Sequence, residues 1–209
     1  NAVNLFTYEL GVGLSGTSSG ETLTVNPVDD SIYDVNGNEA STSQSNNTAT
    51  LTDLNGPMIT SVSSSTADGL YKIGEQIAIE VTVNESVVVT GTPQLTLETG
   101  ATDAVVNYSS GSGNNTLVFN YTIASGDINS DLEYQSTSAL ALNGGTIKDA
   151  SGNASTITLP TLGTANSLAG NKALVVDGVV PTFMQPPLTS IANNNTYIDI
   201  VLTEAVYNA

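Results

Sequence analysis

Apolar and polar residues alternate along most of this chain, and this alternation limits its fold more than any other feature. The period of two occurs in QIAIEVTV at 76–83, PQLTLET at 93–99, AVVNYSS at 104–110, TLVFNYTI at 116–123 and TYIDIVLTEAV at 196–206. Successive side chains of a strand point to opposite faces of a sheet, so the pattern predicts strands with one buried face. Turn signals rich in Gly and Asn separate these segments, and no segment has the apolar spacing and caps of an amphipathic helix. We therefore predict an all-β fold.

The charge balance argues against several classes of function. The chain has 20 acidic residues, 3 lysines, no arginine, no histidine and no cysteine, for a net charge of −17. Such a surface argues against nucleic acid and anionic membranes, because both are bound by clustered basic residues. Without His or Cys, zinc sites and the familiar Ser-His and Cys-His catalytic pairs are not expected. We predict that the chain is not an enzyme. It has no apolar run of about 18 residues, so we also predict no membrane insertion.

The chain repeats itself at long range. The acidic turn DASGNAST at 149–156 has an earlier counterpart in DVNGNEAST at 34–42. Three pairs of acidic residues align in order, with separations of 115–124 residues: Asp34 with Asp149, Asp53 with Asp177, and Glu85 with Glu204. This period matches the size of one β-sandwich domain.

The repeat predicts how the chain divides. We expect residues 57–177 to form one complete β-sandwich domain and residues 1–53 to form the C-terminal half of a preceding one. Residues 181–209 supply the N-terminal strands of a following or complementing domain. Each partial domain would leave an open sheet edge, which is unfavourable in water. Either the chain is a segment of a longer array, or neighbouring molecules complete each other, or the two ends form one interrupted domain.

The strand order of such a sandwich predicts a cluster of carboxylates. Glu85 ends the second strand, Asp149 begins the hairpin before the last strand, and Asp53 lies in the linker, so all three fall at the same end of the domain. Gathered carboxylates repel one another unless a cation neutralises them, and calcium takes six to eight oxygen ligands. We expect calcium there, with further oxygens from Asn153 and from the linker carbonyls near 54–55. The aligned Asp34, Asp177 and Glu204 are the corresponding candidate ligands of the partial domains.

A second interpretation of the acidic turn needs no metal. Asp-x-x-Gly-Asn forms a good hairpin turn by itself, because Asp accepts backbone hydrogen bonds and Gly or Asn tolerates a left-handed conformation. The repetition of the turn together with its Glu and linker Asp partners favours the metal. The densest acidic pair, Asp29 and Asp30, occurs in a turn-like segment and is not expected to be catalytic. Tyr134 is expected to be a packed corner tyrosine.

The quoted residues resemble a known family. The segments DGLYKIGEQIAIEVTVNESVVVTGTPQLTLETG at 68–100 and NYSSGSGNNTLVFNYTIASGDINSDLEYQSTSALALNGGTIKDASGNASTITLP at 107–160 are similar to the bacterial Ig-like repeats of very large surface proteins and adhesins. The resemblance covers residues 57–181, and the flanks look like a second repeat type. It implies a secreted, cell-surface array of β-sandwiches stiffened by calcium at the linkers. It also implies Glu85, Asp149 and Asp53 as ligands, although the linkers 54–57 and 178–181 depart from the usual Thr-Thr-Ala-Pro type.

Three functional hypotheses follow. The first is a structural extender or stalk of an extracellular cell-surface protein, whose partners are neighbouring repeat domains. The second is a subunit of an extracellular filament, in which identical subunits complete each other by strand addition. The third is a carbohydrate-binding or hydrolytic module, which the absence of Trp and of a clear acid–base pair disfavours.

Overall fold

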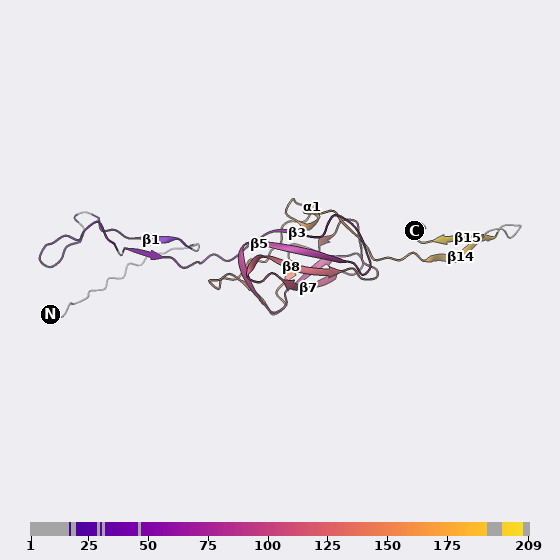
Figure 1. Ribbon diagram of the computed structural model, residues 1–209, viewed down its shortest axis with the longest axis horizontal. Coiled ribbons are helices and arrows are strands. Elements are labelled where there is room, and N and C mark those ends of the chain that lie inside the picture. Colours follow the sequence, from indigo (N-terminus) through magenta and orange to yellow (C-terminus); the bar gives the residue numbers. More distant parts are fainter. Residues whose placement is uncertain are drawn as a thin grey trace.

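The computed structural model describes residue 17 and residues 20–28, 30, 32–45, 47–191 and 198–206. Most of the strands lie in a central body formed by residues 57–177, and a two-stranded hairpin extends from each end of it (Figure 1). The predicted strands are present, and several antiparallel sheets dominate the described chain. The prediction of an all-β fold is therefore confirmed.

The larger sheet of the central body is antiparallel throughout. Its main path runs β10-β6-β7-β8-β5-β12, with β11 also paired to β6 and β3 to β5. The bounds are β3 Ile59–Ser64, β5 Gln76–Thr90, β6 Gln94–Glu98, β7 Ala104–Ser110, β8 Asn114–Thr122, β10 Glu133–Tyr134, β11 Leu140–Ala141 and β12 Thr146–Lys148. The long strand β5 joins β3, β8 and β12, so it connects both ends of the body.

A smaller sheet completes the central body. It has the order β4-β13-β9, with bounds Gly69–Lys72, Leu174–Asp177 and Ile128–Asn129. Strand β13 pairs with β4 in parallel and with β9 antiparallel. The last strand of the body thus runs parallel to β4 and carries the chain toward the end opposite the N-terminal linker (Figure 1).

The alternating residues form one apolar core. In β5, Ile77, Ile79 and Val81 are fully buried, at 0% exposure. They pack with Phe119 of β8 and with residues of the smaller sheet such as Leu174 in a single cluster. Burying one such side chain contributes about 1.5–3 kcal/mol to the free energy of folding. Burial of the alternating apolar residues is therefore the main stabilising contribution in the body.

Tyr134 lies in this core as the sequence predicts. It is fully buried, and its hydroxyl donates a hydrogen bond to the carbonyl of Pro160. Burial raises its pKa, and the neighbouring Glu133 carboxylate adds to the effect. The hydroxyl therefore stays protonated and keeps its role as a donor.

One short helix was not predicted. Helix α1 (Leu168–Asn171) has only four residues, too few to show a helical period in the sequence. Ser167 caps its start, since the side-chain oxygen accepts a hydrogen bond from the amide of Gly170 at 3.2 Å. No helix in the described parts of the chain has the length and apolar character that a membrane span requires.

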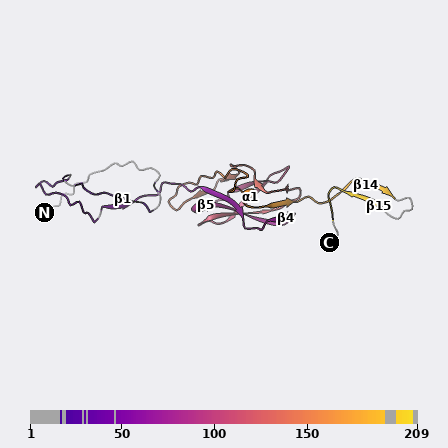
Figure 2. The ribbon, with the colours of Figure 1, turned by 90° about the horizontal axis from the view of Figure 1, so that it is seen from above.

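The two end hairpins extend in opposite directions from the body. One consists of β1 (Thr22–Thr24) and β2 (Thr48–Thr50), and the other of β14 (Phe183–Ile191) and β15 (Ile198–Leu202). Both views show them at opposite ends of the long axis (Figure 1, Figure 2). The division of the chain into a complete domain and two partial ones stays a prediction.

Candidate metal centre

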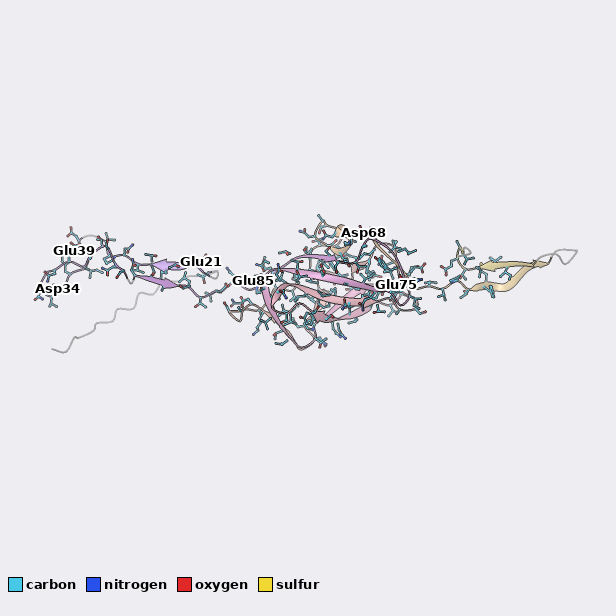
Figure 3. All side chains as sticks on the ribbon, viewed as in Figure 1. Glu21, Asp34, Glu39, Asp68, Glu75 and Glu85 are labelled. Atoms are coloured by element: carbon cyan, nitrogen blue, oxygen red, sulfur yellow. The ribbon has the colours of Figure 1, made fainter. Side chains whose placement is uncertain are left out.

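Three carboxylates from distant parts of the sequence meet at one end of the central body. One oxygen each of Asp53, Glu85 and Asp149 lies within 4.8 Å of the others. Asp53 belongs to the linker after β2, Glu85 to β5, and Asp149 to the turn after β12. Figure 3 shows Glu85 at the end of the body that faces the β1–β2 hairpin, and Glu75 at the other end. The three carboxylates therefore lie together as the strand order predicts, whereas their binding of a metal stays a prediction.

The Asp149 turn is held by its own residues. Oδ1 of Asp149 accepts a hydrogen bond from the amide of Asn153 at 2.8 Å, and Oδ2 accepts one from the Asn153 side-chain amide at 2.8 Å. Gly152 supplies the left-handed conformation, with φ of 92°, that closes the turn. Asp149 is only 5% exposed. The turn thus presents a fixed, largely buried carboxylate to the linker.

Asn153 also fastens the linker to the turn. Its side-chain Nδ2 donates to the carbonyl of Asp53 at 3.0 Å and to that of Asn55 at 3.3 Å. The amide group therefore acts as a cross-link in this structure, while the ligand role expected for its oxygen is untested. At Gly56 a Cβ atom would lie 2.2 Å from the carbonyl oxygen of Ala154, so only glycine allows this approach. Gly56 carries no signal in the sequence, because its contact arises only when the linker and the turn are placed together.

Local irregularity in β5 brings Glu85 to the cluster. The pairing of β5 with β8 shifts register between Thr82 and Val87, which marks a bulge around Glu85. Asn84 holds the start of β3 beside it, because its side-chain oxygen accepts a hydrogen bond from the amide of Met58 at 2.7 Å. Bulges re-aim side chains, and here the bulge directs a carboxylate toward the linker instead of along the sheet face.

The three carboxylates perturb one another. Desolvation raises the pKa of Glu85, and the negative charges of Asp149 and Asp53 raise it further. Burial acts in the same direction on Asp149, but hydrogen bonds from Asn153, Gly152 and Ser151 outweigh it and leave the pKa of Asp149 below its ordinary value. The lowered pKa of Asp149 favours its ionised form. The repulsion between the like charges acts mainly on Glu85, whose pKa it raises.

This donor set suits a hard divalent cation. Three carboxylates offer up to six oxygens, and an open pocket of about 660 Å³ beside them is lined by residues 53–56, Met58, Asn84 and Glu85. Calcium accepts carboxylates, amide oxygens and backbone carbonyls in flexible geometry, whereas magnesium requires a nearly ideal octahedron and keeps more water. The residues present therefore fit calcium better than magnesium.

The pKa shifts predict how stability depends on pH when no divalent cation is present. A raised pKa means that the folded state binds the Glu85 proton more tightly, so this contribution to stability is lost as the pH rises through the folded-state pKa. In a chelator, we expect the urea midpoint of the wild-type protein to be higher at about pH 5 than at about pH 7. The difference between the two midpoints should be smaller in Glu85→Gln. Glu80→Gln, which removes the same charge from the same strand outside the cluster, should keep the wild-type slope. Equal slopes in all three proteins would contradict the prediction.

The turn at Asp34 has the same local structure as the turn at Asp149. Oδ1 of Asp34 accepts from the amide of Asn38 at 2.8 Å, and Oδ2 accepts from its side-chain amide at 2.8 Å. These bonds lower the pKa of Asp34. Each turn is also flanked by an antiparallel bridge, Tyr33 with Glu39 and Lys148 with Ala154. The local part of the repeat is therefore the same at both sites.

The remaining predicted ligands do not assemble within the described chain. Asp34 lies at the far tip of the N-terminal segment, well away from Glu85 (Figure 3). Asp177 and Glu204 belong to the other end, beside the β14–β15 hairpin, and none of the three joins a group of three carboxylates in the part of the chain that the structure describes. Oδ1 of Asp177 accepts from the amide of Val179 at 3.1 Å, as Oδ1 of Asp53 does from Asn55 at 3.0 Å.

Other acidic positions have structural roles. Asp29 lies outside the described residues, whereas Asp30 accepts a hydrogen bond from the hydroxyl of Tyr33 at 2.5 Å. A larger open pocket of about 820 Å³ lies over β7 and β8 and includes Asp127. That carboxylate accepts hydrogen bonds from the hydroxyl of Tyr121 at 2.6 Å and from the amide of Ala124 at 2.8 Å, so it stabilises a loop.

Comparisons of the chain with protein-family models, curated proteins and solved structures found no match.

Proposed function

We propose that this chain is a structural extender of a bacterial cell-surface protein, built from tandem Ig-like β-sandwiches whose junctions bind calcium. The observation that carries the proposal is the meeting of Asp53, Glu85 and Asp149. One carboxylate comes from the linker and two from the body, so a shared cation would join the linker to the body. Because the joined parts are consecutive along the chain, the bound cation would limit bending at the junction.

The tandem arrangement has its own support. The Asp34 turn has the backbone bonds of the Asp149 turn: Asp34 N donates to Asn38 O at 2.9 Å, as Asp149 N does to Asn153 O at 3.1 Å. The acidic residues that follow the same order at both ends of the chain add to this correspondence. An extracellular location fits the acidic surface and calcium, which is more plentiful outside cells than inside them.

Small-angle X-ray scattering tests the junction. With calcium, we expect the wild-type chain to keep a larger maximum dimension and a narrower range of shapes than in a chelator, because the linker is then fixed to the body at Asp53. Asp53→Asn should behave in calcium as the wild type does in the chelator. Asp131→Asn removes an exposed carboxylate outside the cluster and serves as the control. An unchanged maximum dimension together with an unchanged melting temperature would remove calcium from the proposal.

A further inference from the structure

The linker before the central body runs alongside residues 153–156 of the body. The amide of Thr156 donates a hydrogen bond to the carbonyl of Pro57 at 2.7 Å, and the hydroxyl of Ser155 donates to the same carbonyl at 3.1 Å. Met58 forms a parallel bridge with Thr156. The last residues of the linker are therefore tied to the body by strand-like contacts that involve no carboxylate.

Asn153 continues this attachment toward the start of the linker. Its side-chain Nδ2 lies 3.0 Å from the carbonyl oxygen of Asp53, 3.3 Å from that of Asn55 and 2.8 Å from Oδ2 of Asp149. All three neighbours are acceptors, so the donor end of the amide group faces them. An amide nitrogen carries two hydrogens, and the longest of the three contacts therefore shares one of them. A single neutral side chain thus connects two linker carbonyls with the carboxylate of the turn.

Gly56 lets the linker lie close enough for these bonds. A Cβ atom at this position would be 2.2 Å from the carbonyl oxygen of Ala154, which is shorter than van der Waals contact allows. Any side chain at Gly56 would therefore push the linker away from the turn. The close approach and the bonds from Asn153 depend on each other.

The turn at Asp34 shows that Asn153 does more than close its own turn. The side-chain amide of Asn38 donates to Oδ2 of Asp34 at 2.8 Å, as that of Asn153 does to Asp149. In the part of the chain that the structure describes, the Asn38 side chain donates to no linker carbonyl. The bonds from Asn153 to the linker are therefore additional to what this kind of turn requires.

These additional bonds oppose a repulsion. Without a cation, the negative charges of Glu85 and Asp149 act to move the Asp53 carboxylate outward into solvent. Asp53 is nevertheless only 8% exposed. Asn153 binds the backbone of Asp53 itself, so it holds this residue at the body against the like charges.

We propose that Asn153 is a positioning residue, which attaches the linker to the body by donating hydrogen bonds and holds Asp53 in place without a cation. A cation then meets a linker carboxylate that is already positioned. Removing partners that orient metal ligands typically weakens metal binding by about 10- to 100-fold, although they do not touch the metal. The part of the inference that concerns the cation rests on the proposed function, whereas the attachment of the linker does not require calcium.

Backbone ¹⁵N relaxation of the full chain in a chelator tests the attachment. In the wild type, the amides of residues 54–56 should have order parameters near about 0.85, the value of rigid backbone, and Asn153→Ala should lower them toward about 0.6. Gly56→Ala should loosen the linker in the same way while Asn153 is intact, because the added Cβ separates the linker from the turn. Asn38→Ala is the matched control: it breaks the same bond in the other turn and should leave residues 54–56 ordered.

Asn153→Asp distinguishes a donor from an oxygen ligand. Aspartate has nearly the same shape, but at neutral pH it presents only acceptors to the three neighbouring acceptors. In the chelator it should therefore loosen residues 54–56 at least as much as Asn153→Ala does. If the residue acted only through its oxygen, the aspartate would leave the linker ordered.

Calorimetric titration with calcium gives a second measurement. Asn153→Ala keeps all three carboxylates of the cluster, yet its dissociation constant for calcium should rise by about tenfold or more, because Asp53 is no longer held in place. Asn38→Ala should bind calcium like the wild type.

Three relaxation results would overturn the inference: residues 54–56 that stay ordered in both Asn153→Ala and Gly56→Ala, equal loosening in Asn38→Ala, or full order in Asn153→Asp. An unchanged calcium affinity in Asn153→Ala would remove its role in positioning Asp53. A wild type that binds no calcium, with a linker that still loosens in Asn153→Ala, would contradict the proposed function and support the attachment. The two therefore fail separately.

Discussion

Saturating calcium should raise the melting temperature of the wild-type protein by about 5–10 °C and should raise that of Glu85→Gln far less. A ligand at about 100 times its dissociation constant stabilises the folded state by about 2.7 kcal/mol, and in a chain of this size each kcal/mol corresponds to about 2–4 °C. The substitution removes one of the three carboxylates that meet at the linker. Differential scanning calorimetry in calcium and in a chelator measures both values.

The order of the two proteins should reverse in the chelator. Without a cation, Glu85 is repelled by Asp149 and Asp53, so the neutral glutamine relieves a cost that the wild type bears. Glu85→Gln should then be at least as stable as the wild type, although it is less stable in calcium. A substitution that only damaged packing would lower stability in both conditions. Glu80→Gln should shift with calcium as the wild type does, and a wild type that does not respond to calcium would contradict the prediction.

The strands were predictable because their signal is local and repeated. In β5, side chains at 77, 79, 81 and 83 point to the core, and this period is visible without any long-range information. The parallel pairing of β13 with β4 was not predictable in the same way. It depends on where the last strand returns in space, and the four-residue segments involved are too short to specify their partners.

The candidate site also has a part that could be predicted from the sequence and a part that could not. Strand direction decides which end of the body a residue occupies, so the convergence of Asp53, Glu85 and Asp149 could be argued from their order. The details that bring the oxygens within 4.8 Å could not. They depend on the bulge around Glu85 and on the absence of a side chain at Gly56, and neither leaves a distinctive pattern in the sequence.

Glu133 had no signal in the sequence, although it is one of the few buried charged residues of the body. It is 8% exposed. Its Oε1 accepts hydrogen bonds from the amides of Leu168 at 3.1 Å and Tyr134 at 3.2 Å, and its Oε2 accepts from those of Ala169 at 3.3 Å and Gly163 at 3.4 Å. The carboxylate thus holds the start of α1 and the loop before it against β10.

Glu133→Gln should lower the free energy of unfolding by about 2–3 kcal/mol, since hydrogen bonds to a charged group contribute more than neutral ones and a lost partner leaves buried donors unsatisfied. Glutamine is nearly the same size, but its amide group places a donor against backbone donors. Urea unfolding in calcium and in chelator measures the loss, which should be equal in both because Glu133 is not part of the carboxylate cluster. Glu98→Gln is the matched control: Glu98 lies directly opposite Glu133 in the β6–β10 pair but is exposed, so its loss should stay within about 0.5 kcal/mol. Equal losses in the two variants would show that the charge at 133 matters only through the net charge of the protein, and a loss confined to calcium would connect Glu133 to the metal site instead of to α1.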